Sequence, residues 1–123
     1  MVLVVDDHPA TREVVAALLR KRGIDTRIVP SGHAALRFLA IIRPDAVVLD
    51  LSMPDMNGLE ILRAIRSNPR LSQVPVLIFS AHENQFDAAE QNGAQVRVVK
   101  GRTSWMSLIS QIETLAMTAN AHG

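Results

Sequence analysis

Short apolar runs of strand length alternate along this chain, five times over, with stretches of helical periodicity. The predicted strands are Val2–Val5, Thr26–Val29, Ala46–Leu49, Val76–Phe79 and Val96–Val99. They are rich in Val, Ile and Leu, and most lack the polar alternation of a half-exposed strand. This composition is typical of strands that are covered on both faces. Such an alternation leaves little choice of fold, because it predicts a doubly wound α/β domain with a parallel sheet and right-handed crossovers.

Helix signals frame the segments between these strands. The first predicted helix ends before Gly23. The second has an N-cap at Ser31 and is stopped by Pro44, and the third starts at about Gly58 and stops before Pro69. The fourth covers about 83–92 and the fifth about 103–117. Apolar residues recur on one face of each helix. We expect Val14, Ile42 and Phe86 to face the core, and Trp105 to be partly buried.

Length and composition predict one folded domain. The 123 residues are 48% apolar with a net charge of +1 and scattered charges, so neither a nucleic-acid nor a membrane surface is predicted. The absence of cysteine excludes a disulfide framework and a thiolate metal site. No signal peptide or membrane span is visible, so we expect a cytoplasmic protein. We expect a domain over residues 1–117 and a flexible C-terminal tail over 118–123.

Polar residues follow four of the five predicted strands. The first strand ends in Asp6 and Asp7, the third in Asp50, the fourth in Ser80 and the fifth in Lys100. In a doubly wound sheet these ends meet at the edge where ligands bind. Any one of the acids alone is more simply a helix cap or a solvated loop residue. Together, the residues predict a functional site.

The charges of this set indicate its chemistry. Two carboxylates ~4 Å apart repel by roughly 4 kcal/mol at an effective dielectric constant of about 20. Three converging carboxylates therefore require a proton or a cation, and oxygen ligands favour Mg²⁺. A carboxylate beside such an ion can attack phosphorus and form an aspartyl-phosphate. Lys100 and Ser80 would then contact the phosphoryl oxygens. His8 could be counted as a metal ligand, but we expect it at the rim of the site, beside the first helix.

The chain resembles the receiver domain of two-component response regulators over essentially its whole length. The carrying motifs are Val4-Val5-Asp6-Asp7-His8-Pro9, Val48-Leu49-Asp50-Leu51-Ser52-Met53-Pro54-Asp55-Met56-Asn57-Gly58, Ile78-Phe79-Ser80-Ala81 and Val98-Val99-Lys100. The resemblance implies a flavodoxin-like three-layer sandwich, with a five-stranded parallel sheet in the order 2-1-3-4-5.

The same resemblance implies a role for each site residue. Asp50 would be the phosphoacceptor, assisted by Lys100 and Ser80. Asp7 and Asp50 would bind Mg²⁺ directly, Asp6 would act mainly through a metal-bound water, and the Ser52 backbone carbonyl would complete the protein ligands. The domain would accept its phosphoryl group from a histidine kinase or a phosphotransfer domain. It would signal by conformational change to an output domain or effector on the face of the fourth helix, fifth strand and fifth helix.

Two positions depart from the family pattern. Arg97 stands where the family usually has Tyr or Phe, and Gly101 stands where it usually has proline. Burying an unpaired guanidinium is costly, so we expect Arg97 to point outward. A non-proline cis bond costs roughly 2.5–4 kcal/mol, so we expect a trans Lys100–Gly101 bond. Both departures bear on how phosphorylation is transmitted, and neither touches the phosphorylation chemistry.

Two other function classes fit the same fold. A pseudo-receiver would keep the fold and act as a phosphorylation-independent protein-interaction module; the intact acidic site argues against it. A phosphatase with an aspartyl intermediate would usually need a second acid close after the nucleophile, and Ser52 occupies that place. The receiver is therefore the favoured interpretation. It is not an enzyme in the usual sense, although it would catalyse its own aspartyl phosphorylation and dephosphorylation.

Overall fold

The computed structural model of this chain describes residues 1–81 and 83–122, with the side chains of residues 119–122 outside the description. The elements are β1 (Val2–Val5), α1 (Pro9–Lys21), β2 (Thr26–Val29), α2 (Gly32–Leu39), β3 (Ala46–Leu49), α3 (Gly58–Ser67), β4 (Val76–Ser80), the 3₁₀ turn η1 (Glu83–Gln85), α4 (Phe86–Gln91), β5 (Val96–Val99) and α5 (Trp105–His122). All five predicted strands are confirmed, and β4 is one residue longer than expected.

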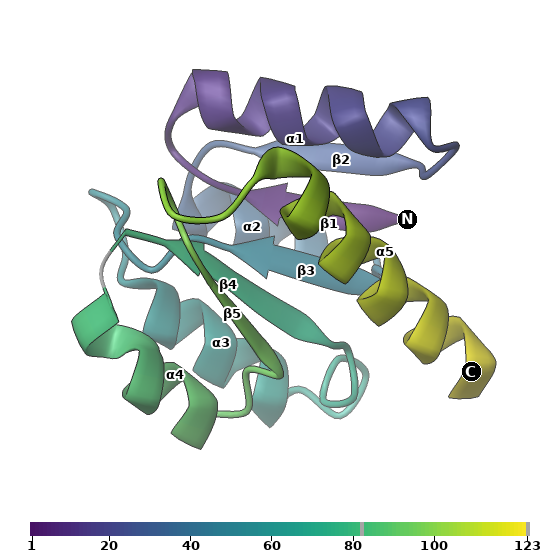
Figure 1. Cartoon of the computed structure of the whole chain (residues 1–123). Coiled ribbons are helices and arrows are strands. Elements are labelled where there is room, and N and C mark those ends of the chain that lie inside the picture. The colour runs from purple at the N-terminus through teal and green to yellow at the C-terminus, as the bar shows by residue number, and fades with distance from the viewer. Residues whose placement is uncertain (82, 123) are drawn as a thin grey trace.

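The strands in the described part of the chain form one parallel sheet in the order β2-β1-β3-β4-β5 (Figure 1). Val5 of β1 aligns with Val29 of β2 on one side and with Leu49 of β3 on the other. The carboxyl ends of these strands therefore lie level with one another. The predicted fold class and strand order are confirmed.

Helices cover both faces of the sheet, with α1 and α5 on one face and α2, α3 and α4 on the other (Figure 1). Side chains alternate between the faces along each strand, so Leu3 and Val5 join the core under α2 and α3. Val2 and Val4 join the core under α1 and α5. This two-sided burial explains why the strands carry apolar residues at successive positions.

Local capping signals place several helix ends. The Ser31 side chain accepts a hydrogen bond from the Ala34 amide, and Asn57 caps α3 in the same way through the Leu59 amide. Gly23 follows α1 with φ of +79°, a backbone conformation in which glycine is favoured because it lacks a Cβ. These interactions confirm the predicted N-cap of α2 and the predicted end of α1.

Some helix expectations were wrong. Helix α2 ends at Leu39, so Ile42 lies beyond it and is 41% exposed instead of facing the core. Val14 is 37% exposed, because α1 packs mainly through Val15, Ala16 and Leu19. The fourth helical segment begins as a 3₁₀ turn and becomes α-helical only at Phe86, which is buried as expected.

The fifth helix runs from Trp105 to His122, five residues beyond the expected end at Met117. The flexible tail expected at 118–123 stays a prediction. Trp105 is 43% exposed, more than the partial burial that was expected, although it contacts the Phe79 ring edge to face with ring centroids 6.1 Å apart. Within the described residues, no helix has the length and apolar character needed to cross a bilayer.

Candidate functional site

The carboxyl ends of β1, β3, β4 and β5 bring Asp6, Asp50, Ser80 and Lys100 to one edge of the sheet. Asp6, Asp50 and Ser80 are buried, with exposed fractions of 2%, 3% and 0%. The Asp50 amide donates to the Val5 carbonyl at 3.0 Å, and the Lys100 amide donates to the Ser80 carbonyl at 3.1 Å. Backbone hydrogen bonds between neighbouring strands therefore position these residues, as the sequence predicts from parallel strands with polar ends.

Lys100 bridges two of the buried acids. Its Nζ lies 2.7 Å from Asp6 Oδ2 and 3.1 Å from Asp50 Oδ2. Burial alone would lower the pKa of Lys100, but the hydrogen bond to Asp6 and the charges of Asp50 and Asp6 outweigh it, so its pKa is raised. Lys100 therefore stays protonated in the neutral pH range and holds a fixed positive charge beside the Asp50 carboxylate.

The loop after β3 wraps around Asp50. The Ser52 amide donates to Asp50 Oδ1 at 3.1 Å, and Ser52 forms an isolated antiparallel bridge with Asn57. Gly58 closes this loop against the sheet, because a Cβ at that position would lie 2.5 Å from the Asp50 carbonyl oxygen. The glycine of the Asp50–Gly58 motif is thus required by a close backbone approach.

Asp55 anchors the same loop to α2. Its carboxylate accepts hydrogen bonds from the amides of Gly32 and His33 at 3.1 and 3.0 Å. These two bonds, that from His33 first, lower the pKa of Asp55. The sequence alone indicates no role for Asp55, because its partners lie more than twenty residues away along the chain and no local spacing marks them.

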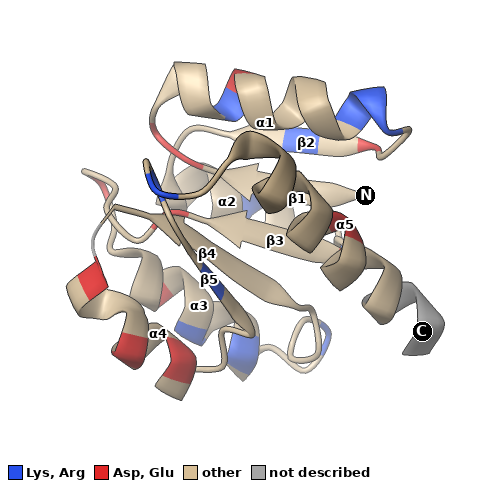
Figure 2. Ribbon diagram, viewed as in Figure 1, with Lys and Arg blue, Asp and Glu red and all other residues tan. Residues whose placement is uncertain are grey.

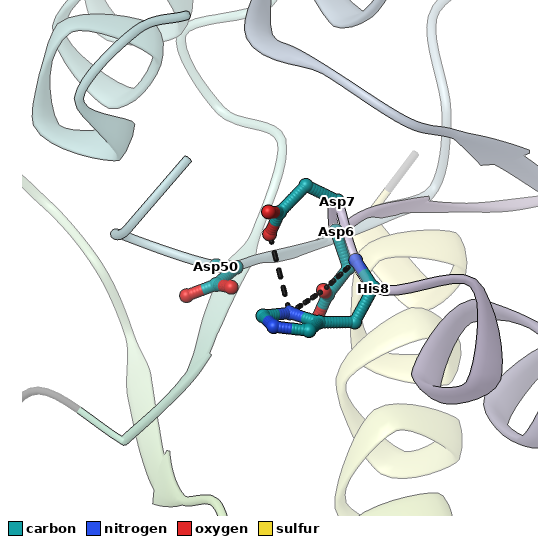
Figure 3. A group of neighbouring side chains, drawn as sticks. All are labelled: Asp6, Asp7, His8 and Asp50. Carbon is teal, nitrogen blue, oxygen red and sulfur yellow. Dashed lines mark hydrogen bonds and ion pairs between the residues drawn. The ribbon is translucent and has the colours of Figure 1, made fainter. Parts of the chain in front are cut away.

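Asp7 and His8 form the open side of the site, because their side chains are 25% and 65% exposed. Both side chains lie beside Asp6 and Asp50 (Figure 3). His8 Nδ1 lies 3.3 Å from Asp6 Oδ1 and 3.2 Å from Asp7 Oδ1. The contact with Asp7 lacks hydrogen-bond geometry, and the buried Asp7 Oδ1 finds no hydrogen-bond partner among the described residues. The His8 side chain is 65% exposed beside the start of α1, as the sequence predicts.

The donor set fits a divalent cation. Asp6, Asp7, His8 and Asp50 each offer one ligand atom, and these atoms lie within 4.8 Å of one another. Three carboxyl groups gather here with one ammonium, so acidic groups outnumber basic ones and a divalent ion would complement the excess. The unpartnered Asp7 oxygen supplies a further reason, because a buried carboxylate oxygen without a partner is costly. How the Ser52 carbonyl takes part stays a prediction.

Arg97 points away from the core. Its guanidinium pairs with Asp87 at 3.4 Å and Glu90 at 3.2 Å on α4, and it lies 6.0 Å from the centre of the Phe86 ring. Acidic residues on α4 thus face a basic residue of β5 (Figure 2). The expected outward position of Arg97 is confirmed for this structure.

Gly101 also behaves as expected. Every peptide bond between described residues is trans, including Lys100–Gly101. Gly101 adopts φ of +84°, which proline cannot adopt because its ring fixes φ near −65°. The loop after Lys100 therefore takes a path that the usual proline of the resembled family would not allow.

These features define a doubly wound α/β domain with an acidic, lysine-containing centre at the carboxyl ends of its strands. The family model described as the response regulator receiver domain matches residues 2–104. The chain therefore belongs to the response regulator receiver domain family, as the resemblance implied.

Individual relatives agree with this assignment. The DNA-binding response regulator MtrA of Mycolicibacterium smegmatis is 37% identical over 101 residues, which cover 80% of this chain and 43% of the relative. The chain thus spans less than half of that relative's length.

Solved structures agree as well. The receiver domain of the Francisella response regulator 1452 has a TM-score of 0.84 at 26% identity, covering 95% of this chain and 96% of that one. Response regulator TrrA from Thermotoga maritima, solved in complex with Mg²⁺-BeF, has a TM-score of 0.81 at 28% identity, covering 93% and 96%.

Proposed function

We propose that this domain accepts a phosphoryl group on Asp50 and passes a signal on by conformational change. The observation that carries the proposal is the position of the Asp50 carboxylate. It is 3% exposed at the end of β3, with Lys100 Nζ 3.1 Å away and the Asp6–Asp7 pair beside it. Aspartate phosphorylation is the general function of the receiver family to which the chain belongs.

The residues around Asp50 suit a phosphoryl transfer. One Asp50 carboxylate oxygen forms the new P–O bond while the P–N bond of a phosphohistidine donor breaks, and the leaving imidazole takes up a proton. Lys100 moves from its carboxylate partners to the incoming phosphoryl oxygens, where its charge balances theirs. The buried Ser80 hydroxyl donates a hydrogen bond to the same group.

A divalent ion would be held by Asp7, Asp50 and the Ser52 carbonyl, with Asp6 acting through water, and Mg²⁺ is the proposed ion. When bound, it would neutralise charge on the transferring phosphoryl group. With few protein ligands and several retained waters, binding should be weak. We expect amide NMR shifts at Asp7 and Asp50 on Mg²⁺ titration. If neither amide shifts by tens of millimolar Mg²⁺, roughly the range of the weakest oxygen-ligand sites, the proposed ligands are wrong.

Two partner surfaces follow from the family. We propose that a histidine kinase or phosphotransfer domain docks beside the open side of the site, and that an output domain or effector contacts the face formed by α4, β5 and α5. The relative MtrA is a DNA-binding response regulator. We propose that DNA binding, where it occurs, belongs to an output domain and not to this one.

The decisive experiment is phosphoryl labelling. The chain is incubated with Mg²⁺ and acetyl phosphate, and its intact mass is measured. We expect the addition of one phosphoryl group, no addition to Asp50→Asn, and an unchanged addition to Asp25→Asn, whose exposed carboxylate lies at the opposite edge of the sheet. Equal labelling of Asp50→Asn would refute the assignment of the acceptor. A wild-type chain that stays unlabelled would favour the phosphorylation-independent interaction module.

A further inference from the structure

His8 is held in an unusual place for an exposed histidine. It precedes Pro9, and the residue before a proline is driven into an extended conformation, here with φ of −86° and ψ of 112°. Its backbone amide donates to Asp6 Oδ1 at 2.9 Å. These two constraints fix the backbone of His8 beside the acidic pair, and its imidazole lies with Nδ1 close to both carboxylates (Figure 3).

The distances match those between ligands that share one ion. Adjacent ligands of an octahedral ion at about 2.1 Å lie about 3.0 Å apart. His8 Nδ1 lies 3.2 Å from Asp7 Oδ1, a direct ligand of the proposed site, and the candidate atom of Asp50 lies within 4.8 Å of both. Opposite ligands of such an ion would lie about 4.2 Å apart, so small side-chain adjustments suffice. Ligation would replace the 3.3 Å hydrogen bond between His8 Nδ1 and Asp6 Oδ1.

A second observation also concerns this side of the site. Asp7 Oδ1 is buried and lacks a hydrogen-bond partner among the described residues, although Nδ1 lies 3.2 Å away. An ion bound by both atoms would satisfy the oxygen without requiring a proton between them. Lys100 occupies the other side of the cluster through Asp6 Oδ2 and Asp50 Oδ2, so it does not compete for these atoms.

The geometry points to His8 Nδ1 as a direct metal ligand, which makes this centre prefer first-row transition-metal ions to Mg²⁺. The inference rests on the metal site of the proposed function and adds a nitrogen ligand to it. Imidazole favours ions such as Ni²⁺ over Mg²⁺, because Mg²⁺ binds oxygen ligands and water most readily. The chemical class of the ligand is thus a divalent transition-metal ion.

The first test compares affinities. Dissociation constants for Mg²⁺ and Ni²⁺ are measured by isothermal titration calorimetry on the wild-type chain, on His8→Ala and on His33→Ala. His33 is the matched control, since it is similarly exposed and its Nε2 lies 3.9 Å from the carboxylate of Asp55, away from the centre. The His8 side chain makes no helix-cap hydrogen bond, so its removal leaves the start of α1 intact.

We expect the Ni²⁺ affinity of His8→Ala to fall at least about tenfold, the lower end of the cost of losing even an outer-shell partner of a metal. The ratio of Ni²⁺ to Mg²⁺ affinity should fall with it, while His33→Ala should match the wild type at this centre. An unchanged or raised Ni²⁺ affinity in His8→Ala would overturn the inference, because His8 would then be a bystander or a competitor of the ion.

The second test observes the bond itself. Pulsed electron paramagnetic resonance of bound Mn²⁺ detects a directly coordinated nitrogen through its nuclear coupling. We expect this coupling in the wild-type chain and in His33→Ala, and its loss in His8→Ala. Absence of nitrogen coupling in the wild-type chain, with Mg²⁺ still binding, would sink this inference alone. Failure of the wild-type chain to bind any of the three ions would instead sink the proposed receiver site and this inference with it.

Discussion

Replacing Arg66 by alanine should destabilise the scaffold that carries β5. The Arg66 guanidinium uses all five of its N–H donors, and every acceptor is a carbonyl or amide oxygen. The bonds reach the Gly93 carbonyl at 3.2 and 2.7 Å, the Ser72 carbonyl at 3.2 Å, the Val74 carbonyl at 2.6 Å and Gln95 Oε1 at 3.0 Å. One side chain thus ties α3 to the segment before β4 and to the segment before β5.

The magnitude follows from which bonds water can replace. Arg66 is half-buried and burial lowers its pKa, so solvent reaches part of this network. We count as irreplaceable only the two shortest bonds, to Val74 and Gly93. At about 1.5 kcal/mol for each bond to a charged donor, Arg66→Ala should lower the free energy of unfolding by about 3 kcal/mol. Arg66→Lys should lose about half of that, because an ammonium cannot span both carbonyls.

Urea unfolding followed by circular dichroism measures this loss, and the thermal midpoint should fall by about 10 °C. Arg63→Ala is the matched control, one turn earlier on α3, because Arg63 is exposed and makes a single 3.3 Å bond to Asn92. Its effect should stay within about 0.5 kcal/mol. A loss below about 1 kcal/mol for Arg66→Ala, or one equal to that of the control, would refute the assumption that these carbonyls depend on the guanidinium.

Three further predictions concern the site and the face that reads it. Arg97→Ala should leave the rate of Asp50 phosphorylation nearly unchanged and cost less than about 1 kcal/mol of unfolding free energy, since its ion pairs are half-exposed; a large loss of labelling would contradict an outward, non-catalytic Arg97. Gly58→Ala should lower the unfolding free energy by about 1–3 kcal/mol and slow labelling, because the new Cβ would meet the Asp50 carbonyl; unchanged melting and labelling would show that the loop yields freely. The pKa of Asp55 is lowered by folding, so its stabilisation is present above its ordinary value of 3.8 and is lost as the pH falls below it; Asp55→Asn should therefore flatten the acid side of the stability profile, and a profile identical to the wild type would refute this linkage.

The position of Arg97 bears on how a phosphorylated Asp50 would be read. Its pairing with Asp87 and Glu90 fastens β5 to α4 through exposed ion pairs, where the resembled family usually carries an aromatic side chain that moves inward. We expect Arg97 to remain outward after phosphorylation. A signal would then pass through the Ser80 loop and α4, and salt should weaken the contact between α4 and β5 because exposed ion pairs are screened.

Much of the fold was predictable because it depends on local patterns. Five apolar runs identify the strands, and the three central ones, β1, β3 and β4, are buried throughout, since a two-sided parallel sheet needs apolar residues at successive positions. Ser31 and Gly23 mark helix ends because capping involves only neighbouring residues. The gathering of Asp6, Asp50 and Lys100 was predictable as well, because the ends of parallel strands share one edge.

The predictions of buried helix residues were wrong at two positions, one beyond a helix end and one on a partly exposed helix face. The periodicity around Ile42 continues beyond the point at which α2 ends, and the pattern alone gives no reason for an end at Leu39. Val14 and Val15 are equally apolar, and only the packing of α1 against the sheet and α5 decides that Val15 is buried and Val14 is not. Apolar composition limits which residues can be buried, but it does not fix the rotation of a helix about its own axis.

The chemistry of the site was set by side chains that the sequence places at strand ends, but its geometry was decided by contacts between distant segments. Asp55 acquires its role only when α2 lies against the loop after β3, and Gly58 only when α3 starts against the Asp50 carbonyl. Likewise, the four acceptors of Arg66 and the carboxylate partners of Arg97 come from segments that meet only in the folded domain. Periodicity and motif spacing record which face a residue prefers, whereas hydrogen bonds and ion pairs depend on distances in space that folding alone establishes.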